Sequence, residues 1–191
     1  MKHFSFLITL LLVALFEDAQ TYVSEDFTTA TFPPDGWSID AHDANWAKSN
    51  TRNANGADVG EANLHWSPQF NGITHFISPV VDLTGVTDLS LEFNQMLDFY
   101  GGSTEYIGVA TRSGGSDWNV VWDTPGATIP AEHKVLTITT PDVGAADFQF
   151  CLYFNGSSYN INDWYIDDIR LFTPFAHDAA ASEVLGDTYF Q

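Results

Sequence analysis

The sequence predicts an all-β sandwich, and three observations support this fold class. Short runs rich in Val, Ile, Thr and aromatic residues recur along the 191-residue chain, separated by Gly, Pro, Asn or Asp. No long segment keeps the 3.6-residue spacing of apolar residues that an amphipathic helix requires. Hydrophobic residues make up 45% of the chain and charged residues 16%, a balance that suits one packed domain and not a disordered polymer. A chain with these features is expected to fold into two packed antiparallel sheets.

Nine segments carry the strand signal. They are residues 22–27, 63–66, 74–78, 88–96, 105–111, 119–123, 133–139, 148–154 and 163–172. The segment DLSLEFNQM shows the alternation most clearly, because Leu89, Leu91 and Phe93 face one side of an extended strand and the polar residues between them face the other. One face of this strand is therefore expected in the core and the other in water.

Turns separate these segments. TFPPDGW and RSGGSDW read as turns, since Pro presets the backbone angle φ and Gly permits positive φ. The stretch 40–62 is longer, polar and rich in Asn and Gly. A long ordered loop in a compact sandwich usually binds a ligand or is held by one, so this stretch is a candidate site.

Both ends of the chain differ from the middle. In residues 1–19, Lys2 precedes an apolar run over 4–16, which has the length of a signal-peptide core and is too short for an ordinary membrane-spanning helix. Cleavage after Ala19 would place Glu17 where a small residue is expected, so a buried or membrane-tethering N-terminal helix is the alternative. The domain then covers 20–172, and 173–191 form a linker or the start of a following module.

These boundaries lead to an expected location and context. We expect a secreted or cell-surface protein with further domains covalently linked to this one, and no stable membrane insertion once the signal peptide is removed.

The formal net charge of −19 repels phosphate backbones, which excludes nucleic acid as a partner and is compatible with cation binding. The single cysteine, Cys151, lies in the apolar run FQFCLYF, where it is expected to be a small buried side chain. Without a disulfide, bound metal is one source of rigidity for an exported domain.

The sequence lacks the common enzyme signatures. It contains no His-Glu-x-x-His zinc motif, no Gly-x-Ser-x-Gly nucleophile elbow and no Gly-rich phosphate loop followed by Lys and Ser or Thr. The six histidines show no metal-ligand spacing. A glycosidase needs two carboxylates on either side of a cleft, and no acidic pair stands out by its strand spacing. The sequence therefore favours a non-catalytic protein.

Carboxylates in the loops suggest calcium. This ion takes six to eight oxygen ligands from side chains, backbone carbonyls and water, so separated segments can build one site. The segment IDAHDANW offers Asp40, Asp43 and Asn45 in a short turn, although the full Asp-x-Asp-x-Asp-Gly pattern is missing. The two carboxylates of this turn, Asp40 and Asp43, are candidate metal ligands.

The strand INDWYIDDIRLF carries two adjacent carboxylates, Asp167 and Asp168, which point to opposite faces of an extended strand. We expect Asp168 to point inward and to close a calcium site between the first and last strands, with Asp167 on the solvent side or as a second ligand. An inward carboxylate is costly unless a cation, an Arg or backbone N–H groups meet it, and the chain has only five Lys and Arg outside the leader. The alternative is that Asp168 merely accepts backbone hydrogen bonds.

Four segments in order carry a resemblance to a known family: EDFTTATFPPDGWSIDAHDANW, ITHFISPVVDLTGVTDLSLEF, SGGSDWNVVWD and WYIDDIRLF. Over about residues 24–172 the chain resembles the cleaved-adhesin and MAM-like modules of exported Bacteroidetes proteins, also called choice-of-anchor domains. The resemblance implies a galactose-binding/MAM-like jelly roll of about ten strands that serves as a non-catalytic adhesin or accessory module, with structural calcium. By the same resemblance, Glu25, Asp40, Asp43, Glu61 and Asp168 match acidic positions of the family.

Three functions remain open at this point. The first is a calcium-stabilised adhesin module that binds a glycan or a host or matrix protein, with Tyr100, Trp122 and Tyr159 as candidate ligand-binding aromatics near turns. Any one of these aromatics could instead be packing surface, because aromatics dominate sandwich cores. The second function is a structural spacer beside a secreted protease or other enzyme. The third is a jelly-roll glycoside hydrolase.

Overall fold

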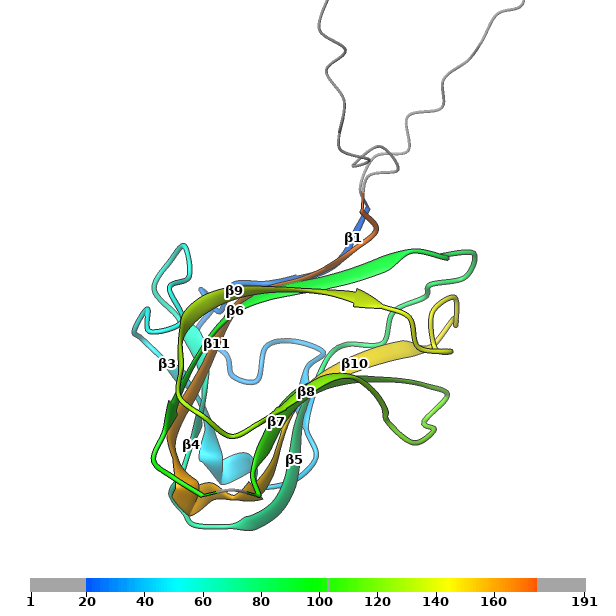
Figure 1. Ribbon diagram of the computed structural model, residues 1–191. Coiled ribbons are helices and arrows are strands. Elements are labelled where there is room, and N and C mark those ends of the chain that lie inside the picture. The colour runs from blue at the N-terminus through cyan, green and yellow to red at the C-terminus, as the bar shows by residue number, and fades with distance from the viewer. Residues whose placement is uncertain (1–19, 103, 175–191) are drawn as a thin grey trace, which may run out of the picture.

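The computed structural model describes residues 20–102 and 104–174, which form a β-sandwich of two antiparallel sheets (Figure 1). The strands are β1 (Thr21–Glu25), β2 (Ser38–Ile39), β3 (Trp46–Ser49), β4 (Glu61–His65), β5 (Asn71–Ile77), β6 (Leu89–Phe99), β7 (Tyr106–Ser113), β8 (Asn119–Pro125), β9 (Ile129–Ile138), β10 (Phe148–Ser157) and β11 (Ile161–Phe172). Two single turns of 3-10 helix, η1 (Asp43–Asn45) and η2 (Ser158–Asn160), precede β3 and β11. The predicted jelly-roll sandwich is confirmed.

The six-stranded sheet has the order β3-β4-β11-β6-β9, and β1 also pairs with β11. Strand β6 follows one edge of β11 along its whole length. The other edge is shared, because β4 pairs with Asp163–Ile166 and β1 pairs with the stretch from Ile169 to Phe172. Between these two partners, at Asp167 and Asp168, the register against β6 shifts in a β-bulge. The bulge thus lies where β11 changes neighbours.

The five-stranded sheet has the order β2-β5-β10-β7-β8 and faces the first sheet across the core (Figure 1). Aromatic side chains fill the space between the two sheets. Trp37 and Trp46 stack on Phe76 with ring centroids 4.6 and 5.4 Å apart, and Trp164 packs 6.2 Å from Trp46. Such pairs each add about 0.5–1.5 kcal/mol beyond the burial of their area.

All nine predicted strands are present, and the structure adds two short ones. Strand β2 ends just before the polar stretch 40–62, and β3 lies within it. This stretch is therefore not one continuous loop. Strand β2 has only two residues, and only Trp46 is buried in β3, so neither shows an alternation that a sequence reading could detect. The leading alternation is confirmed, since Leu89, Leu91 and Phe93 are all buried.

The first and last described residues lie side by side. Thr173 N donates to Gln20 O at 2.9 Å, and Gln20 N donates to Thr173 Oγ1 at 3.0 Å. The predicted signal peptide and most of the predicted linker lie outside the described residues. Within 20–102 and 104–174, no helix has the length and apolar character needed to cross a membrane.

Candidate functional site

Three exposed aromatic rings meet at one end of the sandwich, and we call Trp66, Tyr100 and Tyr159 the aromatic corner. Trp66 follows β4, Tyr100 follows β6, and Tyr159 lies in η2 just before β11. The ring of Tyr159 is 6.3 Å from that of Trp66 and 5.7 Å from that of Tyr100, at interplanar angles of 88° and 78°. The three residues are 37%, 65% and 50% exposed. Ring faces that would be buried in a sandwich core are here open to solvent.

Backbone hydrogen bonds hold the three segments of the corner together. Tyr100 N donates to Asn160 O at 2.9 Å, and Trp66 N donates to Asn162 O at 3.4 Å. The Ser158 hydroxyl donates to Trp66 O at 2.8 Å and is itself buried. The rings are thus placed by the fold before any ligand arrives, which lowers the entropic cost of binding.

Glu105 supports the corner from inside. It is 1% exposed and accepts hydrogen bonds from Asn160 Nδ2 at 2.5 Å and Thr104 N at 3.1 Å. Burial acts to raise the pKa of Glu105, but the hydrogen bonds from Asn160 and Thr104 outweigh it and lower the pKa. A Cβ on Gly102 or Gly156 would crowd Glu105, so both glycines make room for this carboxylate. An ionised, buried Glu105 therefore fixes the residue next to Tyr159.

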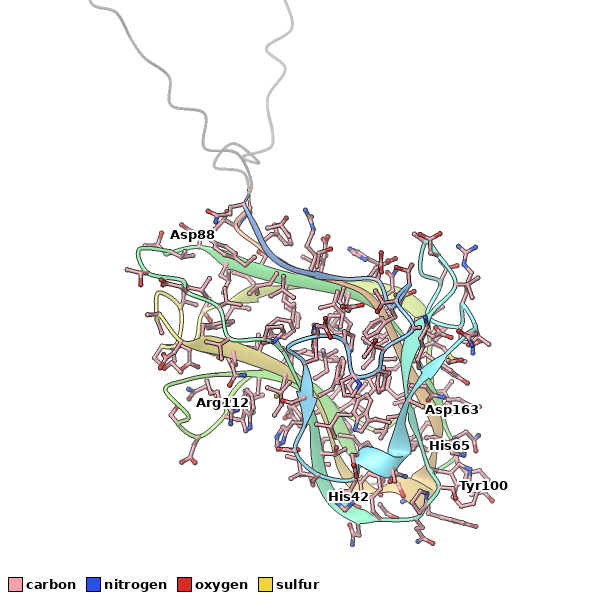
Figure 2. All side chains as sticks on the ribbon, turned by 180° about the vertical axis from the view of Figure 1, so that it is seen from behind. His42, His65, Asp88, Tyr100, Arg112 and Asp163 are labelled. Carbon is pink, nitrogen blue, oxygen red and sulfur yellow. The ribbon has the colours of Figure 1, made fainter. Side chains whose placement is uncertain are left out.

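Polar groups flank the corner on the outer face of the six-stranded sheet. His65 Nδ1 lies 3.0 Å from Asp163 Oδ1, and the imidazole is 5.8 Å from the Trp66 ring. Asn63 Nδ2 donates to the same carboxylate oxygen at 3.0 Å. Asp98 of β6 is the direct cross-strand neighbour of Asp163. Figure 2 shows His65, Asp163 and Tyr100 together at the end of the molecule away from Asp88.

Two of the three predicted ligand-binding aromatics, Tyr100 and Tyr159, are brought together by the fold, and the third is not. Trp122 of β8 packs against the core, and Lys134 Nζ lies 4.2 Å from its ring centroid. Trp66 was not predicted as part of this group, because it was assigned to the end of the predicted strand 63–66. The nearby Pro68 is the signal that could have placed Trp66 at the start of a turn.

The six predicted metal ligands do not form one cluster. Asp40 accepts hydrogen bonds from His75 N at 3.0 Å and from His75 Nδ1 at 2.6 Å, on the five-stranded sheet. Asp43 is exposed and accepts from Ala44 N. Glu25 accepts from Phe27 N at 2.8 Å, and burial raises the pKa of Glu25. In the described part of the chain no three His, Cys, Asp or Glu side chains come close enough together to hold a metal by themselves.

Glu61 anchors the loop 51–60. Its carboxylate accepts hydrogen bonds from Asn53 N at 3.0 Å, from Ala54 N at 2.8 Å and from the Thr51 hydroxyl. Glu61 is fully buried although it starts the strand β4 on its outer face, because this loop folds over it. Every bond that it accepts comes from the loop, which explains how a polar 10-residue segment becomes ordered.

The orientation predicted for the acidic pair of β11 is wrong. Asp167, not Asp168, is the fully buried carboxylate, while Asp168 is partly exposed. The bulge is the cause, because Asp168 has a positive φ of 47° and the strand does not alternate there. Asp168 Oδ2 accepts from Ala57 N at 3.0 Å and from Asn94 Nδ2 at 2.9 Å. A period-two reading cannot detect such a bulge.

Asp167 is incompletely satisfied. Its Oδ1 accepts from Asp168 N at 2.8 Å, while its Oδ2 is buried and has no hydrogen-bond partner. Burial raises the pKa of Asp167 to about 7, and the charges of Asp168, Glu61 and Asp26 act in the same direction. A Cβ on Gly56 would overlap this carboxylate, so the loop 51–60 presses directly on it. An unpartnered buried oxygen surrounded by other acids is the environment that a cation would complete.

A second group of side chains covers the outer face of the five-stranded sheet. His75 stacks on Trp118 with centroids 5.2 Å apart, and the Arg112 guanidinium lies 4.3 Å from the centroid of Trp118. Tyr153 OH donates to Asp123 Oδ2 at 3.3 Å beside them. His75 and Tyr153 are 7% and 6% exposed, so this face offers far less open ring surface than the aromatic corner.

Comparisons with known proteins identify the fold. No family model matches the sequence, and no curated protein matches it. A cleaved adhesin domain of the Lys-gingipain Kgp from Porphyromonas gingivalis has a TM-score of 0.59 at 16% identity, over 81% of this chain and 99% of that domain. The carbohydrate-binding module TmCBM61, solved in complex with β-1,4-galactotriose, has a TM-score of 0.57 at 18% identity, over 81% and 99%.

A third solved structure has the same fold. The module CBM27-1 of Caldicellulosiruptor saccharolyticus, in complex with mannohexaose, has a TM-score of 0.53 at 18% identity and covers 81% of this chain and 96% of that module. The resemblance to cleaved adhesin modules seen in the sequence is thus confirmed at the level of the fold.

Proposed function

We propose that this chain is a non-catalytic glycan-binding module, stabilised by Ca²⁺, that belongs to a larger exported protein. The observation that carries the proposal is the aromatic corner, in which the Tyr159 ring stands nearly perpendicular to the rings of Trp66 and Tyr100. Trp66, Tyr100 and Tyr159 are 37%, 65% and 50% exposed. Sugar rings have apolar C–H faces that stack on aromatic faces, while their hydroxyls need hydrogen-bond partners at the edge. Asp163, Asn63 and His65 supply such partners beside Trp66.

The position of the corner supports a role in capture. It lies at the start of β11, whereas Gln20 and Thr173 pair just beyond the end of this strand. Solved modules of the same fold include ones in complex with galactotriose and mannohexaose and an adhesin domain, which agrees with a binding role for this chain. A spacer role would need no exposed aromatic cluster.

The carboxylates with raised pKa do not favour glycoside hydrolysis. A glycosidase keeps one carboxyl protonated beside its substrate. Burial raises the pKa of Asp167, but this side chain has no exposed surface and lies beneath the loop 51–60. It cannot reach a glycan bound at the aromatic corner.

Calcium is proposed at the bulge of β11. The unpartnered Asp167 Oδ2 fits a cation. Of the other predicted ligands, Asp168 is the next residue of β11, and Glu25 and Glu61 lie on β1 and β4, which pair with β11. Backbone carbonyls of the loop 51–60 and of the segment after β1 would supply further oxygens, since calcium accepts such ligands. Calcium here would neutralise a crowded acidic region and tie β1, β4 and β11 to the loop. Asp40 and Asp43 are not part of this proposal, because Asp40 is bound to His75 on the other sheet.

Glycan binding is tested by screening the full chain on a glycan array and measuring affinity for each hit by calorimetry. We expect Tyr100→Ala and Tyr159→Ala each to weaken binding by about tenfold, because a stacked ring contributes about 1–2 kcal/mol. Val80→Ala is the matched control, since Val80 is 63% exposed and lies outside the corner. An array without hits, or corner variants that bind as well as the Val80 variant, would refute the proposal.

A further inference from the structure

We propose that the aromatic corner selects glycans that carry free, protonated amino groups over neutral or acetylated ones. This inference rests on the glycan-binding function proposed above and adds the chemical class of the ligand. Three features of the corner support it: the angles between its rings, the carboxylates beside it and the absence of Lys and Arg there.

The rings present π faces on two sides of a corner. Tyr159 stands almost perpendicular to both Trp66 and Tyr100, with centroids 6.3 and 5.7 Å away. The face of an aromatic ring carries negative potential and attracts a cation within about 6 Å of its centroid. A flat row of rings would suit any sugar face, whereas crossed rings allow one ammonium group to contact two faces.

Carboxylates add to this negative potential. Asp98 and Asp163 are direct cross-strand neighbours on β6 and β11, at the end of the sheet from which Tyr100 extends. The buried Glu105 lies behind the corner, and its hydrogen bonds lower its pKa and keep it ionised. Like charges directly opposite each other in a sheet are destabilising, so a cation bound beside this pair would relieve the repulsion.

The basic side chains of the described chain lie elsewhere. All five Lys and Arg residues have partners away from the corner: Lys48 with Thr29 O, Arg52 with Gly56 O, Arg112 with Gln149, Lys134 with Trp122 and Glu132, and Arg170 with Glu92. His65, 3.0 Å from Asp163, carries a positive charge near the corner only when it is protonated. A protonated amine on a ligand would meet ring faces and carboxylates without Lys or Arg repulsion.

The test compares two hexasaccharides of equal length, one of glucosamine with free amines and one of N-acetylglucosamine. Affinities of the full chain are measured by calorimetry below the pKa of the sugar amines, at low and at high salt. We expect the glucosamine hexamer to bind at least about tenfold more tightly, and this preference to fall as salt screens the carboxylates. In the variant Asp98→Asn the preference should fall below about threefold while binding of the acetylated hexamer is kept.

Asp88→Asn is the control, because it removes one exposed negative charge at the other end of the molecule (Figure 2). Asp163 is left unchanged because it accepts from Asn63, and the melting temperature of Asp98→Asn is measured to separate loss of preference from loss of fold. If both hexamers bind equally, the inference is wrong and the proposed function stands. If neither binds and the array is empty, the proposed function itself fails.

Two further outcomes would overturn the inference. An equal loss of preference in Asp88→Asn would mean that the net charge of the whole chain, and not the corner, attracts the amine. A Lys-rich peptide that competes as well as the glucosamine hexamer would mean that the corner recognises protein amines and not a glycan.

Discussion

Asp167 takes its character from one backbone irregularity. The residue after it has φ +47°, so the carboxylate turns under the loop 51–60 and loses contact with water. Its neighbour Asp168, with an identical side chain, accepts two hydrogen bonds and stays partly exposed. Burial raises the pKa of Asp167 from an ordinary value of 3.8 to about 7, so proton uptake and cation binding compete for the same oxygen.

The first prediction concerns the pH dependence of stability without calcium. A carboxyl whose pKa is raised in the folded state stabilises the fold below the unfolded pKa, and this contribution is lost as the pH rises through the folded pKa. In EDTA the melting temperature is therefore expected to fall between about pH 4 and pH 7. Saturating calcium should raise it most above pH 7, where Asp167 is ionised. Thermal unfolding followed by circular dichroism measures both effects.

Asp167→Asn tests whether Asp167 causes both the pH dependence of stability and the stabilisation by calcium. This variant should lose the pH-dependent fall in EDTA and also most of the stabilisation by calcium. Asp43→Asn is the comparison, because Asp43 is exposed and is not part of the calcium site proposed at the bulge. A calcium shift that survives intact in Asp167→Asn would place the ion elsewhere and exclude this site.

At the scale of elements, the loop 51–60 is the segment on which the acidic region depends. Glu61 binds the beginning of the loop, Gly56 lies against Asp167, and Gly60 approaches the carbonyl of Phe27. Phe27 itself has a positive φ of 52° at the end of β1. The loop is therefore packed against the junction of β1, β4 and β11, where the bulge lies.

The second prediction is that Gly60→Ala destabilises the fold by about 2–4 kcal/mol. The position combines a φ of 139°, which L residues rarely adopt, with an overlap between the new Cβ and Phe27 O. Gly85→Ala has a φ of 84° and no atom within 4 Å, so it isolates the backbone cost of about 1 kcal/mol. Chemical denaturation of both variants gives the difference. Equal losses would show that the contact with Phe27 O does not restrain the loop.

At the scale of the whole molecule, repulsion between the many negative charges destabilises the folded state. The formal net charge is −19, and the described Lys and Arg residues already have partners. Self-repulsion of this size lowers stability at low ionic strength and is screened beyond about 8 Å at 0.15 M salt.

The third prediction is that sodium chloride raises the melting temperature of the calcium-free chain. We expect the free energy of unfolding to increase by about 1 kcal/mol between low and physiological ionic strength, which raises the melting temperature by about 2–4 °C for a chain of this size. A variant with Asp35, Asp82 and Asp117 changed to Asn should show a smaller effect, because these acids are exposed. A melting temperature that does not change with salt would mean that self-repulsion is not a significant cost.

Much of the fold could be predicted from local patterns. Leu89, Leu91 and Phe93 alternate in the sequence and are buried, and Cys151 lies at 0% exposure as a small apolar side chain. Gln95 continues the inward series of β6, where it accepts from Trp164 Nε1 and donates to Glu132. Its burial could not be predicted from the sequence, because Gln is polar and a buried amide is tolerated only when partners from other strands bond to it.

The sequence by itself determined the sandwich, the positions of its main strands along the chain and the acidic surface, because alternation, turn residues and charge are properties of neighbouring residues. Only the tertiary structure decided which acid is buried, since the bulge at Asp168 arises where β1 and β4 meet on β11. It also decided that Trp66, Tyr100 and Tyr159 form one corner. These residues are 34 and 59 positions apart in the chain, and only the pairing of β4, β6 and β11 brings them together.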